Sequence, residues 1–299
     1  MLIFLDIDGT LTDMRGVIPD STAEALAEAK ANGHRLIIGS GRSMCEIYPH
    51  MRESGLFTGY VAGAGAYVEL DGRVLRDRPM PADMAGRAMC WLKESGADFI
   101  CECNDYMYEY RSSIDNLIEG AVKRLGEGER ARIEANYARI VRPVCEGNWD
   151  FSREDAAQFA RTHGVNKILY YHNRFSAEEM EHQIPGCLVL PSSFLKGMNG
   201  IGEISEKGVS KADGVRLISD TLGVPVSQTM AFGDGANDRE MLMAAGTGVA
   251  MGNAVPELKE LADYVTDDYD KDGIRNAFRH FGLCEEPGKP IIEKIHRNS

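Results

Sequence analysis

Apolar runs and amphipathic stretches alternate in the first part of the chain. The run Met1–Phe4 has the length of a buried strand and is too short for a membrane span. Ala23–Ala31 is expected to be a helix that ends at Gly33, and His34–Ile38 follows as a second apolar strand. A strand, a helix and a strand in this order predict a right-handed parallel crossover, so both strands should end at the same edge of one sheet.

The same alternation returns after residue 200. Ser210 can cap a helix over Lys211–Leu222, and Thr229–Phe232 has the apolar character of a strand. Further elements are expected at Cys45–Glu53, Tyr60–Ala62, Arg239–Ala245, Gly248–Met251, Glu257–Leu261 and Ile274–Phe281, with a hairpin turn at Asp71-Gly72. Alternating strands and helices of this kind predict an α/β fold around a parallel sheet.

The chain between these two parts has a different character. Pro79 and Pro81 mark a boundary, and up to about Leu190 strands and helices follow one another without regular alternation. We expect them at Met84–Lys93, Phe99–Cys103, Met107–Tyr110, Ile114–Leu125, Asp155–Thr162, Lys167–Tyr171, Glu178–Gln183 and Cys187–Leu190, with a polar stretch around Gly126–Arg132. The sequence thus predicts that residues 1–81 and 191–299 form one domain, and that residues 82–190 are an inserted α+β domain of ordinary size.

The charge and composition of the chain limit the kinds of molecule that it is expected to bind. Its 299 residues carry a formal net charge of −13, which argues against nonspecific binding to a nucleic-acid backbone. Apolar residues make up 43%, enough for a globular core, but no apolar stretch reaches the length of a transmembrane helix and no signal peptide is visible. We therefore expect a cytoplasmic protein that acts without nucleic acid or a membrane, as a monomer or small homo-oligomer.

Seven cysteines are scattered along the chain, an odd number that does not suggest a disulfide framework. Cys101 and Cys103 should face the same side of a strand, and with His172 they could in principle bind zinc. However, no second ligand pair has the spacing of a zinc site. Reduced thiols are the better interpretation.

Two carboxylates follow the first strand, where the chain reads Asp6-Ile7-Asp8-Gly9-Thr10. In an extended chain Asp6 and Asp8 would point the same way, and such a pair is unfavourable without a positive charge between them. A divalent cation that prefers carboxylate oxygens would fit. Taken alone, the motif could also be a surface turn with two solvated acids.

Three more polar clusters follow other predicted strands or begin helices: Ser40-Gly41-Arg42, Lys211, and Asp234 with Asn237 and Asp238. Asp6, Asp8 and Asp234 offer oxygen ligands for Mg²⁺, and Ser40 and Lys211 offer donors for phosphate oxygens. Each also has a purely structural interpretation, since Ser40 could cap a helix, Lys211 could be solvated and Asp234 could belong to a turn. Their joint position at one sheet edge favours a metal and phosphate site.

These motifs resemble those of the haloacid dehalogenase-like superfamily of phosphohydrolases, in particular the Cof-type branch. Asp6 to Thr10 matches the first motif, Ser40-Gly41-Arg42 the second, Lys211 the third and Gly233 to Asp238 the fourth, and the text from Met251, MGNAVPELKELADYV, is also similar. The resemblance covers residues 1 to about 81 and 195–281. It implies a Rossmann-like parallel-sheet core with an α/β cap inserted between the second and third motifs. One departure is Ala64-Gly65-Ala66, where many relatives read Asn-Gly-Ala.

The resemblance also implies roles for individual residues. Asp6 would be the nucleophile that becomes an aspartyl phosphate, and Asp8 the general acid and then base. Mg²⁺ would be held by Asp6, the backbone carbonyl of Asp8, and Asp234. The phosphoryl oxygens would be bound by Ser40, Gly41, Lys211 and Asn237, with Asp238 orienting Lys211 and Arg42 supporting the structure.

The resemblance favours a Mg²⁺-dependent phosphatase that hydrolyses small phosphate monoesters, such as sugar phosphates or phosphorylated cofactors. A sugar phosphomutase or phosphotransferase of the same superfamily is an alternative, and a non-catalytic phosphate-binding regulator is a third. We expect the partner to be a small phosphorylated metabolite. The inserted segment should contact its leaving group and so determine specificity. We expect this segment to close on the rest of the protein by hinges near Pro79–Pro81 and Leu190–Ser193. The run His172-Asn173-Arg174 could contact the substrate or form an exposed loop.

Overall fold

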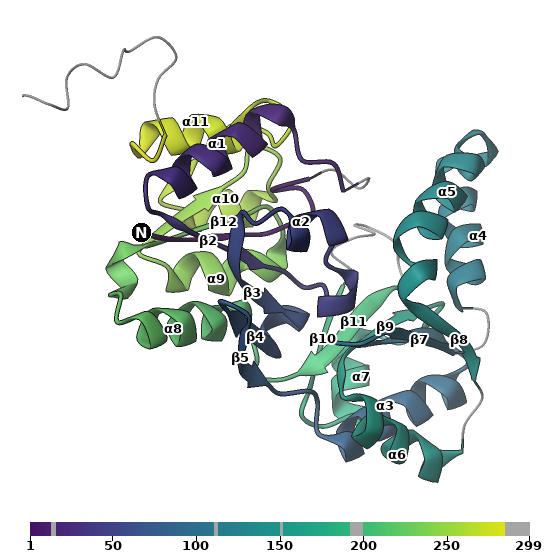
Figure 1. Ribbon diagram of the computed structural model, residues 1–299. Coiled ribbons are helices and arrows are strands. Elements are labelled where there is room, and N and C mark those ends of the chain that lie inside the picture. Colours follow the sequence, from purple (N-terminus) through teal and green to yellow (C-terminus); the bar gives the residue numbers. More distant parts are fainter. Residues whose placement is uncertain (13–15, 111–112, 150–151, 192–199, 285–299) are drawn as a thin grey trace, which may run out of the picture.

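The structure is a computed structural model that describes residues 1–299 except 13–15, 111–112, 150–151, 192–199 and 285–299. Two sheets organise the described residues (Figure 1). One has eight strands and is built from both ends of the chain, and the other has six strands and is built from its middle. The expected α/β fold is thereby confirmed.

The first sheet has the order β14-β13-β12-β1-β2-β3-β4-β5. Its strands are β1 (Leu2–Leu5), β2 (Arg35–Gly39), β3 (Phe57–Ala62), β4 (Tyr67–Leu70), β5 (Arg73–Asp77), β12 (Thr229–Gly233), β13 (Thr247–Ala250) and β14 (Tyr264–Val265). All neighbours from β14 to β3 are parallel, whereas β3, β4 and β5 pair in antiparallel fashion. The hairpin predicted at Asp71-Gly72 joins β4 to β5, and both residues have the positive φ that tight hairpin turns favour.

Helices cover both faces of this sheet (Figure 1). α1 (Asp20–Ala31) and α11 (Gly273–His280) pack on one face, where Leu26 and Phe278 join the core. α8 (Lys211–Leu222), α9 (Arg239–Ala244) and α10 (Pro256–Leu261) pack on the other. Since the central strands β1, β2 and β12 are buried on both faces, they are continuous apolar runs, which is why the sequence pattern revealed them.

The second sheet has the order β10-β11-β9-β6-β7-β8. Its strands are β6 (Asp98–Cys103), β7 (Met107–Tyr110), β8 (Cys145–Trp149), β9 (Val165–Tyr171), β10 (Cys187–Pro191) and β11 (Gly202–Glu206). One face packs on α3 (Ala82–Ser95), α6 (Arg153–His163) and α7 (Ala177–Gln183). The other packs on α4 (Ser113–Leu125) and α5 (Arg130–Ile140). We call the residues from α3 to β11 the second unit.

Several elements differ from the sequence prediction. The helix expected at Cys45–Glu53 is a 3₁₀ turn, Met44–Glu46, followed by the short helix α2 (Pro49–Glu53), because Pro49 disfavours helical backbone in the residue before it. The sequence analysis did not predict α5, β8 or β11. Strand β11 pairs with β10 and β9, so the second sheet continues past residue 190.

The second unit lies against the ends of β2 and β3. Asn166 at the start of β9 donates to Oγ of Ser43 at 3.2 Å, and the Cys45 thiol donates to the Cys103 carbonyl at 3.3 Å. The side chain of Asn166 also packs so closely on Gly63 that a Cβ there would lie 3.1 Å from it. These contacts hold one face of the second sheet near the edge of the first where its parallel strands end.

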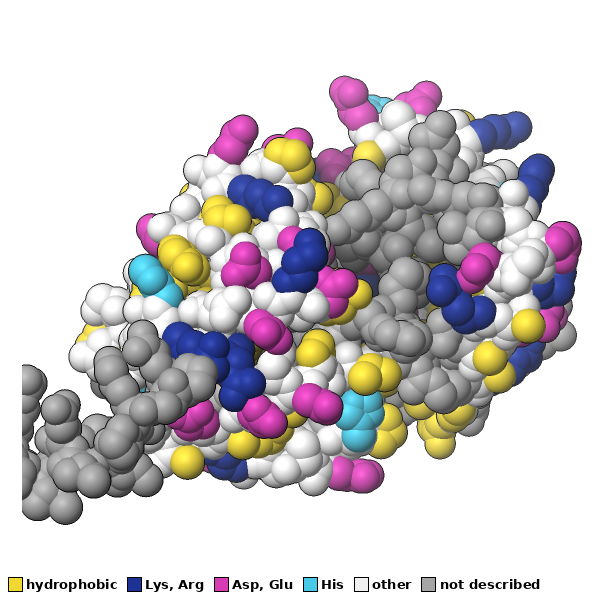
Figure 2. All heavy atoms as spheres, turned by 90° about the horizontal axis from the view of Figure 1, so that it is seen from above, with side chains coloured by type: hydrophobic (Ala, Val, Ile, Leu, Met, Phe, Trp, Pro, Cys, Tyr) yellow, Lys and Arg dark blue, Asp and Glu magenta, His cyan; other side chains and the backbone are white. Residues whose placement is uncertain are grey.

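The surface carries mixed charge. On the face shown in Figure 2, acidic and basic side chains are interspersed with apolar ones. Within the described ranges, none of the helices has the length and apolar character needed to cross a membrane. All seven cysteines are free thiols, and Cys101 and Cys103 lie in one buried cluster, as their spacing predicted.

Candidate active site

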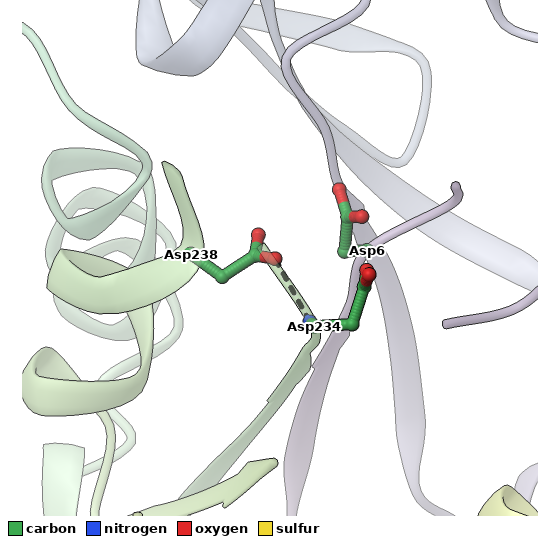
Figure 3. A group of neighbouring side chains, drawn as sticks. All are labelled: Asp6, Asp234 and Asp238. Carbon is green, nitrogen blue, oxygen red and sulfur yellow. Dashed lines mark hydrogen bonds between the residues drawn. The ribbon is translucent and has the colours of Figure 1, made fainter. Parts of the chain in front are cut away.

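Asp6 and Asp234 lie side by side because they follow neighbouring parallel strands. β1 pairs with β12, with Leu5 opposite Phe232, and the Asp6 amide continues the ladder by donating to the Phe232 carbonyl at 3.1 Å. Both carboxylates are almost fully buried and point toward the same space (Figure 3). The sheet therefore brings together two acids that are 228 residues apart in the sequence (234 − 6).

Gly9 shapes the turn that follows Asp6. Its φ is +89°, and a Cβ at this position would lie 2.5 Å from Oδ2 of Asp234. Only glycine therefore fits here, for both conformational and steric reasons. The next residue, Thr10, donates from its hydroxyl to Oδ1 of Asp234 at 3.4 Å. The turn after β1 thus packs directly against the Asp234 carboxylate.

Lys211 connects Asp6, which follows β1, with Asp238, in the loop after β12. It is the first residue of α8, is only 1% exposed, and its Nζ lies 2.7 Å from Oδ1 of Asp6 and 2.6 Å from Oδ1 of Asp238. The other oxygen of Asp238 accepts from the backbone amides of Asp234, at 3.0 Å, and Gly235, at 2.9 Å. Asp238 therefore fixes both the ammonium group and the loop after β12.

The turn around Ala64-Gly65-Ala66 supports the same arrangement. Ala64 donates its amide to the Ser40 carbonyl at 3.1 Å. Gly65 has a φ of +106°, and a Cβ there would lie 2.1 Å from the Ser210 carbonyl oxygen. This turn packs between the loop after β2 and the start of α8 through its backbone. These contacts do not depend on the side chain at position 64.

The electrostatics of the cluster are dominated by burial and like charges. Burial, and then the neighbouring Asp238 carboxylate, raise the pKa of Asp6 well above its usual value, while Lys211 opposes the rise. Burial alone would lower the pKa of Lys211, but Asp238 and Asp6 raise it above its ordinary value. The lysine therefore stays charged, and the site gathers more negative than positive charge.

The excess of carboxylates fits a divalent cation. Ligand oxygens of Asp6, Asp234 and Asp238 all lie within 4.8 Å of one another. Both oxygens of Asp238 already accept hydrogen bonds from Lys211 and from the backbone. Asp6 and Asp234 are thus the better candidates, and hard cations such as Mg²⁺ prefer such oxygens.

Asp8 lies apart from this cluster. The regular strand ends at Leu5, so Asp6 and Asp8 do not follow the simple strand geometry assumed from the sequence. Arg42 holds the Asp8 carboxylate with two hydrogen bonds, Nε to Oδ2 at 2.6 Å and a second to Oδ1 at 2.9 Å. Arg42 also contacts the Tyr48 hydroxyl at 3.0 Å. A forked pair of this kind fixes the orientation of Asp8.

Ser40, Gly41 and Asn237 lie at the same edge. Ser40 is buried, and its hydroxyl accepts from the Arg42 amide at 3.2 Å. A Cβ at Gly41 would lie 3.4 Å from the amide nitrogen of Asn237. The structure therefore places the residues that the sequence analysis selected at one edge of the first sheet, but in separate groups: Asp6, Lys211 and Asp234 are in the buried cluster, Gly41 lies next to Asn237 and follows Ser40, and Asp8 is held apart by Arg42.

Lys167 of the second sheet also reaches this edge and was not predicted. Its Nζ lies 3.8 Å from the Cβ position of Gly41. The available signal was a buried lysine next to an asparagine in a mostly apolar strand with the sequence VNKILYY. The run His172-Asn173-Arg174 instead makes contacts inside the second unit, where His172 bonds to Asp98 at 2.8 Å and Arg174 stacks over Phe175.

Known proteins are similar to this chain over most of its length. A family model described as haloacid dehalogenase-like hydrolase matches residues 3–278. YkrA of Bacillus subtilis (strain 168), whose name describes it as a candidate phosphatase, is 30% identical over 285 residues, which cover 95% of this chain and 98% of that protein. The 5-amino-6-(5-phospho-D-ribitylamino)uracil phosphatase YitU of the same organism is 27% identical over 288 residues, 94% of this chain and 97% of YitU.

A solved structure shows the same architecture. It is that of BT4131, described as a sugar phosphatase of haloacid dehalogenase subclass IIB. It superposes with a TM-score of 0.75 at 27% sequence identity, and the match covers 94% of this chain and 99% of that one. The match therefore extends over the parts of this chain that form both sheets.

Proposed function

Because the chain belongs to the haloacid dehalogenase-like hydrolase family, we propose that it is a phosphatase that hydrolyses small phosphate monoesters through an aspartyl-phosphate intermediate and requires Mg²⁺. The observation that carries the proposal is the buried chain of contacts from Asp6 through Lys211 to Asp238, with Asp234 beside it at the end of the next strand. This arrangement offers a nucleophile, a phosphate-binding cation and a metal ligand within one small space.

Asp6 is the proposed nucleophile. Its carboxylate is buried and is held through one oxygen by Lys211 at 2.7 Å. That contact fixes the direction of the other oxygen, which would attack phosphorus and form the covalent intermediate. Lys211 would then contact both the nucleophile and a phosphoryl oxygen, and Asp238 would keep it in place. Ser40, the Gly41 amide and Asn237 would bind the remaining phosphoryl oxygens.

Asp8 is the proposed general acid and base. It would protonate the leaving oxygen, and the resulting carboxylate would take a proton from the attacking water in the second step. The forked contact with Arg42 keeps its carboxyl group in one orientation. Asp6, Asp234 and the backbone carbonyl of Asp8 would hold Mg²⁺, which when bound would offset the negative charge of the phosphoryl group and of the carboxylates around it.

The substrate is proposed to be a small metabolite such as a sugar phosphate or a phosphorylated cofactor. The descriptions of BT4131 as a sugar phosphatase and of YitU as a phosphatase of a phosphorylated ribityl compound support this class. We also propose that residues 1–81 and 191–299 form the core and residues 82–190 a cap, to whose sheet β11 adds a strand. The segment Leu190–Ser193, proposed as one hinge, lies partly outside the described residues.

Replacing Asp6 by asparagine tests the proposal. The substitution conserves shape but removes the nucleophilic carboxylate, so purified Asp6→Asn should stay folded and lose essentially all turnover of p-nitrophenyl phosphate with Mg²⁺. Beryllofluoride should bind the wild type and not the variant. Asp220→Asn, at an exposed position of α8, is the matched control and should behave like the wild type. If Asp6→Asn retains more than a few per cent of the activity, Asp6 is not the nucleophile.

A further inference from the structure

Three charged side chains contact one another on the face of the second sheet that lies toward the candidate active site. Lys167 on β9 is paired in register with Glu102 on β6, and Glu203 on β11 is paired with Leu169. Nζ of Lys167 lies 3.1 Å from a carboxylate oxygen of Glu102 and 3.1 Å from one of Glu203. We call Glu102, Lys167 and Glu203 the charged cluster.

The cluster lies beside the proposed phosphate-binding loop. Lys167 Nζ is 3.8 Å and Asn237 Nδ2 is 3.4 Å from the same point, the Cβ position of Gly41. Asn166, the residue before Lys167, bonds to Ser43 and packs on Gly63, so the start of β9 contacts the segments that follow β2 and β3. A phosphate ester bound at Ser40 and Gly41 would therefore have its leaving group next to this cluster.

Packing alone does not account for the cluster. Glu102 and Lys167 are 2% and 6% exposed, and buried charges of this kind rarely add stability compared with apolar residues of similar size. Oε2 of Glu102 is ion-paired with Nζ of Lys167 at 3.1 Å, whereas Oδ1 of Asn166, the residue before Lys167, has no hydrogen-bond donor among the described residues. A buried acceptor of this kind needs a partner, and a ligand with hydroxyl groups can supply one.

Resting on the proposed function, we propose that Glu102, Lys167 and Glu203 form the subsite for the leaving group. We infer that this subsite selects monophosphates of uncharged, hydroxyl-bearing compounds over esters whose leaving group carries a second phosphate or a carboxylate.

The charge balance of the cluster is the reason for this choice. Two carboxyl groups already contact the single ammonium, and Glu46, in the 3₁₀ turn after β2, adds another acidic group nearby. Burial, and then Glu46, raise the pKa of Glu102 well above its usual value, with Lys167 opposing them, so an additional negative charge is unfavourable in these surroundings. A second anionic group would increase the repulsion. Hydroxyl groups, in contrast, can donate to the carboxylates and accept from the ammonium.

The experiment compares kcat/KM for four esters with Mg²⁺: p-nitrophenyl phosphate, a hexose 6-phosphate, a hexose 1,6-bisphosphate and 3-phosphoglycerate. The wild type should prefer the hexose monophosphate to the two esters with an additional anionic group. Lys167→Met should lower kcat/KM for the hexose monophosphate at least about tenfold, because a charged hydrogen bond is lost, and change p-nitrophenyl phosphate much less. Glu203→Gln should raise the value for the bisphosphate relative to the monophosphate at least about fivefold.

Lys123→Met and Glu178→Gln, at exposed positions of the second unit, are the matched controls. They should leave the ratios of kcat/KM among the four esters unchanged. Since Lys167→Met leaves two buried carboxylates without their cation, the triple variant Glu102→Gln/Lys167→Met/Glu203→Gln removes the charges together, and its folding is checked by circular dichroism. It should lose the preference for the hexose monophosphate.

The outcomes separate the two hypotheses. A wild type that hydrolyses none of the four esters contradicts the proposed function itself. A wild type that hydrolyses p-nitrophenyl phosphate but prefers the bisphosphate or 3-phosphoglycerate overturns the inference about the leaving group, whether or not the variants fold. Unchanged ratios in folded Glu203→Gln and in the triple variant overturn it as well.

Discussion

Replacing Lys211 by alanine should cost the protein both stability and turnover, whereas replacing Lys207 should affect neither strongly. The two lysines are four residues apart (211 − 207), but their surroundings differ. The Lys211 side chain is 1% exposed and contacts Asp6 and Asp238 at 2.7 and 2.6 Å. The Lys207 side chain is 51% exposed and pairs with Glu181 on the surface at 2.7 Å.

The expected magnitudes follow from this difference. Removing one partner of a buried ion pair costs about 3–5 kcal/mol, because the remaining charge stays buried without compensation. An exposed pair contributes about 0–1 kcal/mol, which sets the upper limit for Lys207→Ala. For turnover, loss of a charged hydrogen bond worth about 1.5–3 kcal/mol predicts that Lys211→Ala lowers kcat/KM at least about tenfold. Lys207→Ala should change kcat/KM little.

Urea unfolding of both variants gives the stabilities, and p-nitrophenyl phosphate hydrolysis with Mg²⁺ gives kcat/KM. The double variant Lys211→Ala/Asp238→Asn is the decisive control. It removes one of the two carboxylates left without a cation, so it should be more stable than Lys211→Ala by about 1 kcal/mol or more. Equal effects of Lys211→Ala and Lys207→Ala, or a double variant no more stable than Lys211→Ala, would refute the reasoning.

Four further outcomes are expected. EDTA should abolish hydrolysis and added Mg²⁺ should restore it, whereas activity that persists after exhaustive chelation would exclude a metal requirement. Arg42→Ala should lower kcat at least about tenfold, and Arg42→Lys should recover little of it because lysine lacks the fork that holds Asp8; full recovery with lysine would contradict this. Burial, and then Glu46, raise the pKa of Glu102 above 4.5, so folding favours its protonated form. The free energy of unfolding of the wild type in urea, relative to that of Glu102→Gln, should therefore fall as the pH rises from 4.5. A difference that stays constant with pH would contradict the shift. Replacing residues 82–206 by a short linker should preserve hydrolysis of p-nitrophenyl phosphate and abolish preference among metabolites, and a preference that survives would locate specificity in the core loops.

The active-site edge could be predicted because it depends on local and repetitive features. The central strands β1, β2 and β12 are buried on both faces, so they appear as apolar runs, and the polar residues that follow them are easily recognised. Parallel order then places these strand ends at one edge, which is how Asp6 and Asp234 could be grouped before their distance was known. The direction of the Asp8 side chain could not be predicted, because it depends on Arg42 and on the turn at Gly9.

The elements that were missed depend on distant contacts. Strand β11 has the sequence GEISE, which is polar enough for a loop, and its partners β10 and β9 give it the hydrogen bonds of a strand. Lys167 was predicted to lie in a strand, but its position beside Gly41 results from how the second unit packs on the first sheet. No periodic pattern in the sequence indicates how the second unit packs on the first sheet.

The strand order of the first sheet also has a consequence for synthesis on the ribosome. β1 lies between β2 and β12, and β12 begins at Thr229, so one side of the central strand lacks its partner until more than three quarters of the chain has emerged. At about 5–20 residues per second, that interval lasts on the order of ten to fifty seconds. The second unit is continuous in the sequence and can complete its own sheet earlier. We therefore expect nascent chains to hold a folded middle and an apolar, unpaired β1 edge, the kind of surface that chaperones bind.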